Sequence, residues 1–498
     1  MVSMERARPD QSRRALEALS GFFTEPRERG AQPGHAEWLA LFHAMAHEVP
    51  AYARFLRQHA IDPAHIHDVD ALRRVPPTTK DNYHRTSPLS DLCRHGRLEA
   101  CDMIALSTGS TGEPTVWPRF VADELGTARR FEQVLVDGFE LDRRRTLGVV
   151  CFALGNWVGG IYTLSCCRQL AAKGYPLTLA APGNNKPEIL RVLRALRGSF
   201  DQVVLFGYPP FIKDVIDAGV ADGFDWSLTP TRIVLAGEVF SEAWRTLVCQ
   251  RLGVSDPARS SASLYGTADG GVLANETPLS IRIRRALSAR PDAARALFGE
   301  ARLPTLCQYD PTHRYFEAED GALLFSGDSG VPLMRYEILD RGGVIPYGEM
   351  RTRLLELGVE LEPGNGAPER ELPFVYVFGR SSFAVSFYGA NVYPENVAVG
   401  LEQPELAPFL TGKFVLEVTH DEQQDAVLSL AVELCAGGSP SAELASAIAR
   451  SVRAHVERQN SEFANYAPAE RRTPVVRLMP FAEPQYFPPG VKHRYTRG

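Results

Sequence analysis

Apolar residues in the first 60 positions recur with the spacing of an α-helix. Leu16, Leu19, Phe22 and Phe23 fall on one face of a helix with about 3.6 residues per turn. The run RRVPPTTKDNY (73–83) then combines two prolines, which favour a turn, with threonines suited to cap a following helix. This part of the chain therefore predicts helices over 10–60, a turn, and a helix that begins after a capping threonine.

Short apolar runs alternate with helical segments between residues 100 and 250. Four of these runs are typical of buried strands: 146–154, 175–181, 202–208 and 232–238. Amphipathic segments at 186–196 and 242–252 have the apolar spacing of helices. Strands that alternate with helices usually form a parallel sheet with crossover helices, so we expect an α/β fold here.

The composition changes after residue 310. From 310 to 400 the segments are β-rich and bounded by Gly, Asp and Pro, which predicts a smaller barrel-like sheet packed on the first lobe, with a surface loop at 361–370. Beyond Arg380, two strands and an Ala-rich helix at 441–458 predict a small α+β domain. We therefore expect a large N-terminal domain with parallel-sheet subdomains over 1–379 and a small domain over 380–498.

The overall composition excludes several classes of protein. Of the 498 residues, 44% are hydrophobic and 23% are charged, which is ordinary for a globular protein. The net charge of −6 offers no attraction for nucleic acid, and no apolar stretch has the length of a membrane span or a signal-peptide core. The 8 cysteines show no CxxC pair, as in a reducing compartment. These features predict a soluble cytoplasmic enzyme with no nucleic-acid or membrane partner.

The segment ALSTGSTGEPT (105–115) has the composition of an anion-binding loop. Its glycines permit positive φ and a close approach of backbone N–H groups to an anion, and its hydroxyls add donors. The segment suits the β- and γ-phosphates of ATP, although no Gly-Lys-Ser/Thr closes it as in a Walker loop. An ordinary Ser/Thr/Gly loop is the alternative. The predicted phosphate-binding residues are Ser107, Thr108, Gly109, Ser110, Thr111 and Gly112.

Two later segments have side chains suited to the rest of a nucleotide. In SLYGTADGG (263–271), a strand that ends at Tyr265 and Gly266 can place the phenol ring against adenine, and Asp269, two residues after Thr267, is an oxygen ligand suited to Mg²⁺. A plain strand-to-loop turn is the alternative here. In PLMRYEILDRGG (332–343), Asp340 is suited to accept hydrogen bonds from ribose hydroxyls, and Arg380 is suited to reach ribose or phosphate.

The order of these segments resembles the adenylate-forming acyl-CoA synthetase superfamily, and within it the phenylacetate–coenzyme A ligase-like branch. The resemblance covers nearly the whole chain. It is carried by VPAYARFLRQHAIDPAHIHDVDALRRVPPTTKDNY (49–83), STGSTGEPT, LAGEVFSEAWRTLV (235–248), YGTADGG, RYEILD and GRSSFAVSFYGANVYP, which follow one another in the family's order.

This resemblance implies a two-step reaction that uses ATP and Mg²⁺. A carboxylate would attack the α-phosphate to give acyl-AMP and pyrophosphate. A mobile C-terminal domain would then rotate about a hinge at Arg380–Ser382 before the acyl group is transferred. The family's adenine-side segment corresponds to Gly237 and Glu238, and its catalytic lysine to Lys492 in PPGVKHRYTRG. Lys413, the other lysine after Arg380, is interpreted as a surface residue.

The sequence also departs from the family's pattern. Ala268 and Asp269 stand where a hydroxyl residue and Glu are usual, Glu113 or Thr115 replaces a basic residue, and Ser382 with Phe383 replaces an acidic pair at the hinge. A degenerate member that binds nucleotide without turnover is therefore one alternative.

The acyl substrate and its acceptor are less sharply defined. The predicted substrate pocket contains Trp157, Tyr208 and Phe211, and the family suggests an aromatic or arylacetic acid. Coenzyme A is the first expected acceptor. An amine or a carrier protein, as in secondary metabolism, is the alternative. A homodimer is one oligomeric state that the sequence allows.

Overall fold

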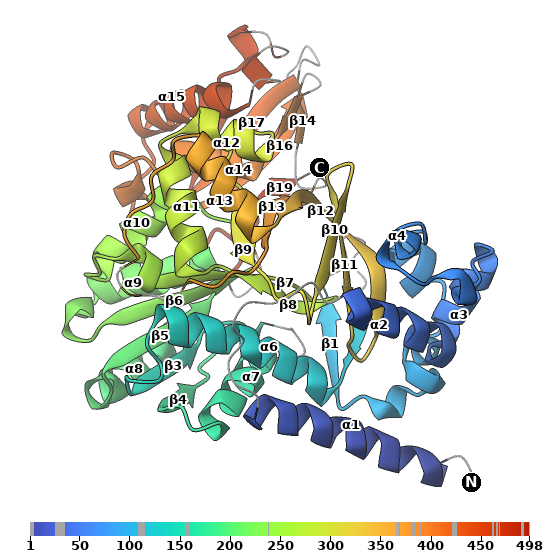
Figure 1. Ribbon diagram of the computed structural model, residues 1–498. Coiled ribbons are helices and arrows are strands. Elements are labelled where there is room, and N and C mark those ends of the chain that lie inside the picture. Colours follow the sequence, from blue (N-terminus) through green and yellow to red (C-terminus); the bar gives the residue numbers. More distant parts are fainter. Residues whose placement is uncertain are drawn as a thin grey trace.

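The computed structural model describes most of the chain (Figure 1). The described residues are 4–24, 35–107, 115–155, 159–237, 239–364, 366, 369–380, 385–387, 390–420, 426–460, 463–464, 467, 469–489 and 493–497. Within these residues, no helix is both long and apolar enough to cross a membrane.

The N-terminal segment is helical, as its apolar spacing predicts. It comprises α1 (Met4–Thr24), α2 (His35–Glu48), α3 (Pro50–Gln58) and the short α4 (Val69–Leu72). After the Pro-rich turn, Thr79 caps the helix Lys80–His84: its hydroxyl accepts a hydrogen bond from the Asn82 amide at 3.0 Å, and the Asn82 side chain accepts one from the Thr79 amide at 2.7 Å. This reciprocal capping fixes the backbone at the start of the helix, where Lys80 lies.

The centre of the molecule is an 11-stranded sheet with the order β10-β11-β12-β13-β9-β8-β7-β6-β5-β3-β4. The strands β4, β3, β5, β6 and β7 are parallel, whereas the remaining pairs are antiparallel. The strand bounds are β3 (Thr146–Val150), β4 (Leu177–Ala180), β5 (Gln202–Gly207), β6 (Thr231–Ala236), β7 (Ser261–Thr267), β8 (Gly271–Asn275), β9 (Thr305–Gln308), β10 (Tyr315–Glu319), β11 (Ala322–Gly327), β12 (Leu333–Ile345) and β13 (Phe374–Arg380).

Helices cover both faces of the parallel part of this sheet. Alternate residues of β5 point to opposite faces: Val204 and Phe206 pack in one buried cluster with α6 (Val121–Gln133) and α7 (Gly160–Ala172). Val203 and Leu205 pack in another with α8 (Lys186–Leu196), α9 (Pro209–Ala221) and α10 (Glu242–Arg251). Strands buried on both faces explain the continuous apolar runs of the sequence.

The β-rich segments after residue 310 do not form a separate barrel-like sheet, as the sequence pattern had suggested. They join the antiparallel edge of the central sheet, where β13 pairs with both β12 and β9. Strand composition predicts a strand but not its partner, because pairing is between segments far apart in the chain. Three further helices flank this region: α11 (Pro278–Ser288), α12 (Pro291–Phe298) and α13 (Tyr347–Glu356).

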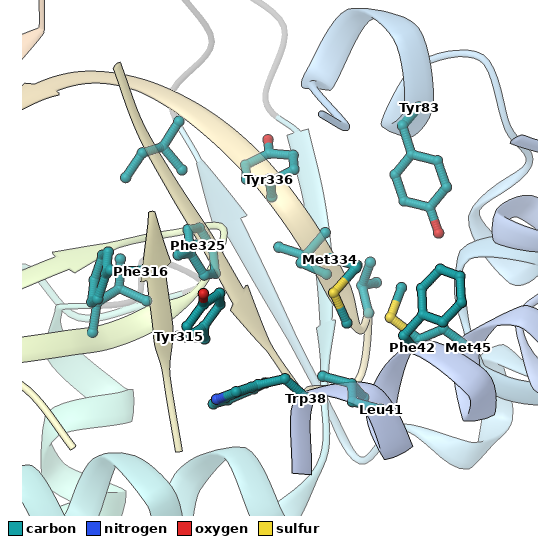
Figure 2. Close-up of a cluster of buried hydrophobic side chains, with 14 of the residues drawn as sticks. Trp38, Leu41, Phe42, Met45, Tyr83, Tyr315, Phe316, Phe325, Met334 and Tyr336 are labelled. Atoms are coloured by element: carbon teal, nitrogen blue, oxygen red, sulfur yellow. The ribbon is translucent and has the colours of Figure 1, made fainter. Parts of the chain in front are cut away.

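The N-terminal helices pack against this antiparallel edge (Figure 2). Trp38, Leu41, Phe42 and Met45 of α2 lie beside aromatic and sulfur-containing side chains of β10, β11 and β12. Backbone hydrogen bonds then join Thr78 to β12, since its amide donates to Arg335 at 3.0 Å and its carbonyl accepts from Glu337 at 2.8 Å. The segment that leads to Lys80 is thus fixed against β12.

The C-terminal part of the chain is built around a separate four-stranded sheet with the order β18-β17-β16-β19. Its own buried cluster joins β16 and β17 to α14 and α15, in agreement with the α+β prediction. The element bounds are β14 (Val385–Phe387), β15 (Ala390–Val392), α14 (Pro394–Leu401), β16 (Leu410–His420), β17 (Ala426–Leu434), α15 (Ala442–Gln459), β18 (Val475–Met479) and β19 (Thr496–Arg497). We call residues 385–497 the C-terminal module and the preceding residues the core.

Candidate active site

A β-hairpin holds the two ends of the predicted phosphate loop together. Ser107 ends β1 (Met103–Ser107) and pairs with Thr115, which begins β2 (Thr115–Arg119). The intervening predicted residues, Thr108, Gly109, Ser110, Thr111 and Gly112, lie outside the described residues. Their role in phosphate binding stays a prediction.

Two predicted nucleotide-binding residues are in contact, and a third is paired with one of them. Tyr265, near the end of β7, donates a hydrogen bond from its hydroxyl to Asp340 Oδ2 of β12 at 2.7 Å. Asp340 pairs in register with Arg380, the last residue of β13. The phenol ring of Tyr265 is stacked on Phe316, with ring centroids 6.2 Å apart. The structure thus brings together the positions predicted for adenine, ribose and the hinge.

The end of β7 has little room for larger side chains. A Cβ atom on Gly266 would lie 2.8 Å from the carbonyl oxygen of Gly271, so only glycine fits there. Thr267 accepts a hydrogen bond from the Gly270 amide at 3.0 Å, which closes the turn. Gly237, after β6, has a positive φ of 82°, and the neighbouring Glu238 lies outside the described residues.

Asp269, the predicted magnesium ligand, already has two partners. Its Oδ1 lies 3.2 Å from the Lys80 ammonium, and its Oδ2 accepts a hydrogen bond from the Tyr336 hydroxyl at 2.8 Å. The carboxylate is 2% exposed, and the described residues contain no cluster of three potential metal ligands. In this arrangement the residues do not form a ready magnesium site, because the Lys80 ammonium is already the cation beside Asp269.

Two arginines that sequence reasoning did not single out hold this turn from its carbonyl side. Arg119, at the end of β2 and 2% exposed, donates to the Ala268 carbonyl, and Arg314 donates to the Gly270 carbonyl at 3.1 Å. Beside Arg119, the buried Asp123 accepts from the Gly330 amide at 2.9 Å. Burial raises the pKa of Asp123 to about 6, although the charge of Arg119 opposes this shift. The sequence did contain one indication of this role for Arg119, because it is an arginine in the strand that directly follows the predicted phosphate loop.

The predicted substrate pocket is only partly brought together. Tyr208 packs with the cluster on the α6–α7 face, and its ring lies edge-on to Phe152 at 4.9 Å. Phe211 packs instead with the cluster on the α8–α10 face. The structure therefore does not join Phe211 to Tyr208, since α9 begins between them and carries Phe211 to the other side of the sheet. Trp157 lies outside the described residues.

The segment of the predicted catalytic lysine is anchored on β16. Lys492 itself lies outside the described residues, but the next residue, His493, hydrogen-bonds through Nε2 to the Phe414 carbonyl at 2.7 Å. Burial lowers the pKa of His493 to about 4. Lys413 is not the surface residue that we expected: its ammonium lies 2.7 Å from Asp214 of α9 and 3.3 Å from Glu433 of β17.

The sequence matches no protein-family model and no curated protein. The structure is similar to a solved 2-hydroxyisobutyryl-CoA ligase bound to 2-HIB-AMP in the postadenylation state, with 13% identity, a TM-score of 0.65, and coverage of 95% of this chain and 92% of that chain. It is also similar to an open form with 2-HIB-AMP and CoA (12% identity, TM-score 0.56, 95% of each chain). A thioesterification-state form gives 13% identity and a TM-score of 0.53 over 93% of this chain and 88% of that chain. The protein therefore has the fold of the adenylate-forming CoA ligases.

Proposed function

We propose that the protein is an ATP-dependent carboxylate-activating ligase, which forms an acyl-adenylate and passes the acyl group to an acceptor. The observation that carries this proposal is the hydrogen bond from Tyr265 to Asp340, with Arg380 paired beside them. An aromatic ring next to a carboxylate suits adenine and ribose. The fold, which includes the C-terminal module, supports the same reaction class.

In this proposal different residues bind different parts of the nucleotide. Ser107 to Gly112 surround the β- and γ-phosphates with hydroxyl and amide donors. Tyr265 faces adenine together with the segment Gly237–Glu238, Gly266 and Thr267 shape the adjacent turn, Asp340 accepts from the ribose hydroxyls, and Arg380 reaches ribose or phosphate.

The proposed first step is a displacement at the α-phosphorus. A carboxylate oxygen forms a new P–O bond while the bond to pyrophosphate breaks, so that acyl-AMP and pyrophosphate result. Lys492 would approach the carboxylate and the α-phosphate and stabilise their negative charge. Catalysis of this kind depends mainly on positioning and on charge stabilisation at phosphoryl oxygens. Asp269 would hold ATP-bound magnesium only if Lys80 no longer paired with it.

The proposed substrate is an aromatic or arylacetic acid, with coenzyme A as first acceptor and an amine or carrier protein as alternatives. One observation favours a different function, a nucleotide-binding protein without turnover. The predicted metal ligand Asp269 is paired with Lys80, so this carboxylate is not free to bind the ion.

A panel of carboxylic acids with ATP, assayed for pyrophosphate release and for acyl-AMP by mass spectrometry, tests this proposal. Release with at least one acid identifies a ligase, and later addition of coenzyme A, amines or a carrier protein identifies the acceptor. ATP-dependent stabilisation of the protein without release from any acid would favour the non-catalytic alternative. No stabilisation by ATP and no release would overturn the nucleotide site itself.

A further inference from the structure

The C-terminal module rests on α8 and α9 of the core through a small set of polar contacts. One of them is the ion pair between Lys413 of β16 and Asp214 of α9, at 2.7 Å. The side chain of Lys413 is 19% exposed and that of Asp214 is 5% exposed. The net free energy that a buried ion pair contributes depends strongly on its geometry, because both charges have lost most of their hydration.

Lys413 has a second carboxylate partner within its own module. Glu433 of β17 lies 3.3 Å from the same ammonium. If the module moves away from the core, Lys413 keeps Glu433 while Asp214 becomes accessible to water. Separation therefore leaves neither charge buried without a partner, so the Asp214–Lys413 contact can open at a lower cost than an isolated buried pair.

The same strand carries the anchor of the predicted catalytic lysine. The Phe414 carbonyl, next to Lys413, bonds to His493, and the Leu416 amide donates to the Tyr495 carbonyl at 2.7 Å. The short strand β19 continues this pairing in parallel with β16. Lys492 directly precedes His493 in the sequence, so the position of β16 on α9 also determines the position of the residue that follows Lys492.

Other contacts also join the C-terminal module to the core. Lys213 donates to the Leu410 carbonyl at 3.2 Å, and the Lys186 ammonium lies 4.7 Å from the centre of the Phe481 ring. Ser241, three residues after Glu238, donates to Glu402. The last of these contacts joins the module to a residue that follows closely, in the sequence, the segment Gly237–Glu238 that the proposed function assigns to adenine.

We propose that Asp214 is a positioning residue, whose ion pair with Lys413 seats the C-terminal module in the orientation used for adenylation and must open before acyl transfer. This inference rests on the proposed function. Asp214 touches no substrate. It acts through Lys413 and β16 on the placement of the segment that contains Lys492.

The test compares the two half-reactions in Asp214→Asn. Adenylation is followed as pyrophosphate release in the first turnover, and transfer is followed from preformed acyl-adenylate to the acceptor. We expect adenylation to slow by about tenfold, within the usual range of coupling between sites, while transfer is unchanged or faster. Asp214→Glu, which keeps the charge, should restore part of the loss. Asp222→Asn, at the exposed end of the same helix, is the matched control.

A second measurement does not depend on turnover. In small-angle X-ray scattering, the Asp214→Asn and Asp214→Lys variants should have a larger radius of gyration than the wild type and the Asp222→Asn control. The reason is that the ion pair no longer holds the C-terminal module against α9. Equal slowing of both half-reactions, or unchanged scattering in both Asp214 variants, would overturn the inference. If the wild type makes no acyl-adenylate from any acid, the proposed function fails, while scattering still decides whether Asp214 seats the module.

Discussion

Lys80 and Asp269 form an ion pair at 3.2 Å that joins the N-terminal segment to the turn after β7. The capped helix start at Thr79 and the backbone bonds of Thr78 to β12 hold Lys80 in place. Asp269 is almost fully buried, and its only other described partner is the Tyr336 hydroxyl. The charge of Lys80 therefore compensates the desolvation of this carboxylate.

Replacement of Lys80 by Met should destabilise the protein. The buried Asp269 would lose its cation, and loss of a charged hydrogen-bonding partner costs about 1–3 kcal/mol. Chemical denaturation would measure the change in free energy of unfolding. Lys80→Arg, which keeps the charge, should lose less, and the double variant Lys80→Met with Asp269→Asn should recover part of the loss. An unchanged midpoint in Lys80→Met would show that the pair contributes nothing.

Tyr265→Phe should separate the role of the ring from that of the hydroxyl. The ring stays available for adenine, whereas the hydrogen bond from the Tyr265 hydroxyl to Asp340 is lost, so stability should fall by about 1 kcal/mol. Asp340→Ala should weaken ATP binding more than Tyr265→Phe, because it removes the proposed ribose acceptor. Isothermal titration with ATP measures both affinities. Equal affinity of Asp340→Ala and wild type would remove Asp340 from the nucleotide site.

Lys492→Ala should abolish pyrophosphate release and leave ATP binding nearly intact. The physical reason is that the lysine stabilises charge that develops in the displacement, not the nucleotide in its ground state. Pyrophosphate release and titration with ATP measure the two effects on the same protein. Arg143→Ala, a substitution at an exposed position of the core, is the control. Normal release by Lys492→Ala would exclude this lysine from the mechanism.

Glu402 gives a pH dependence of stability. Burial raises its pKa to about 7, although the Ser241 hydroxyl and the charges of Arg284 and Lys213 oppose the shift. In the unfolded chain the pKa of Glu is about 4.3, so the folded protein keeps the Glu402 proton to a higher pH than the unfolded chain does. The free energy of unfolding should therefore fall as the pH rises from about 4.3 through about 7, and level off above that.

Thermal unfolding of Glu402→Gln between pH 5 and 8 checks this sign. The variant lacks the titration, so its stability relative to wild type should increase as the pH rises. Glu405→Gln, at an exposed neighbouring position, should follow the wild type. A wild-type and Glu402→Gln difference that is constant over this pH range would contradict the assignment.

The sequence by itself determined the elements whose signals are local. The helix predicted at 186–196 coincides with α8, because its amphipathic spacing and the capping Asn185 define its length. The strand β5 and the capped helix after Thr79 follow for the same kind of reason. The order of the motifs also predicts a nucleotide site that includes Tyr265 and Asp340, and the structure shows that these two side chains are in contact; their binding of a nucleotide stays a prediction.

Only the tertiary structure decided which distant residues are partners. The strands after residue 310 joined the central sheet rather than a barrel, Phe211 packed on the opposite face from Tyr208, and Lys413 paired with Asp214 across two parts of the chain. The physical reason is that strand pairing and ion pairs depend on register and packing between remote segments. Local spacing determines where an element begins and which face it buries, but not what that face meets.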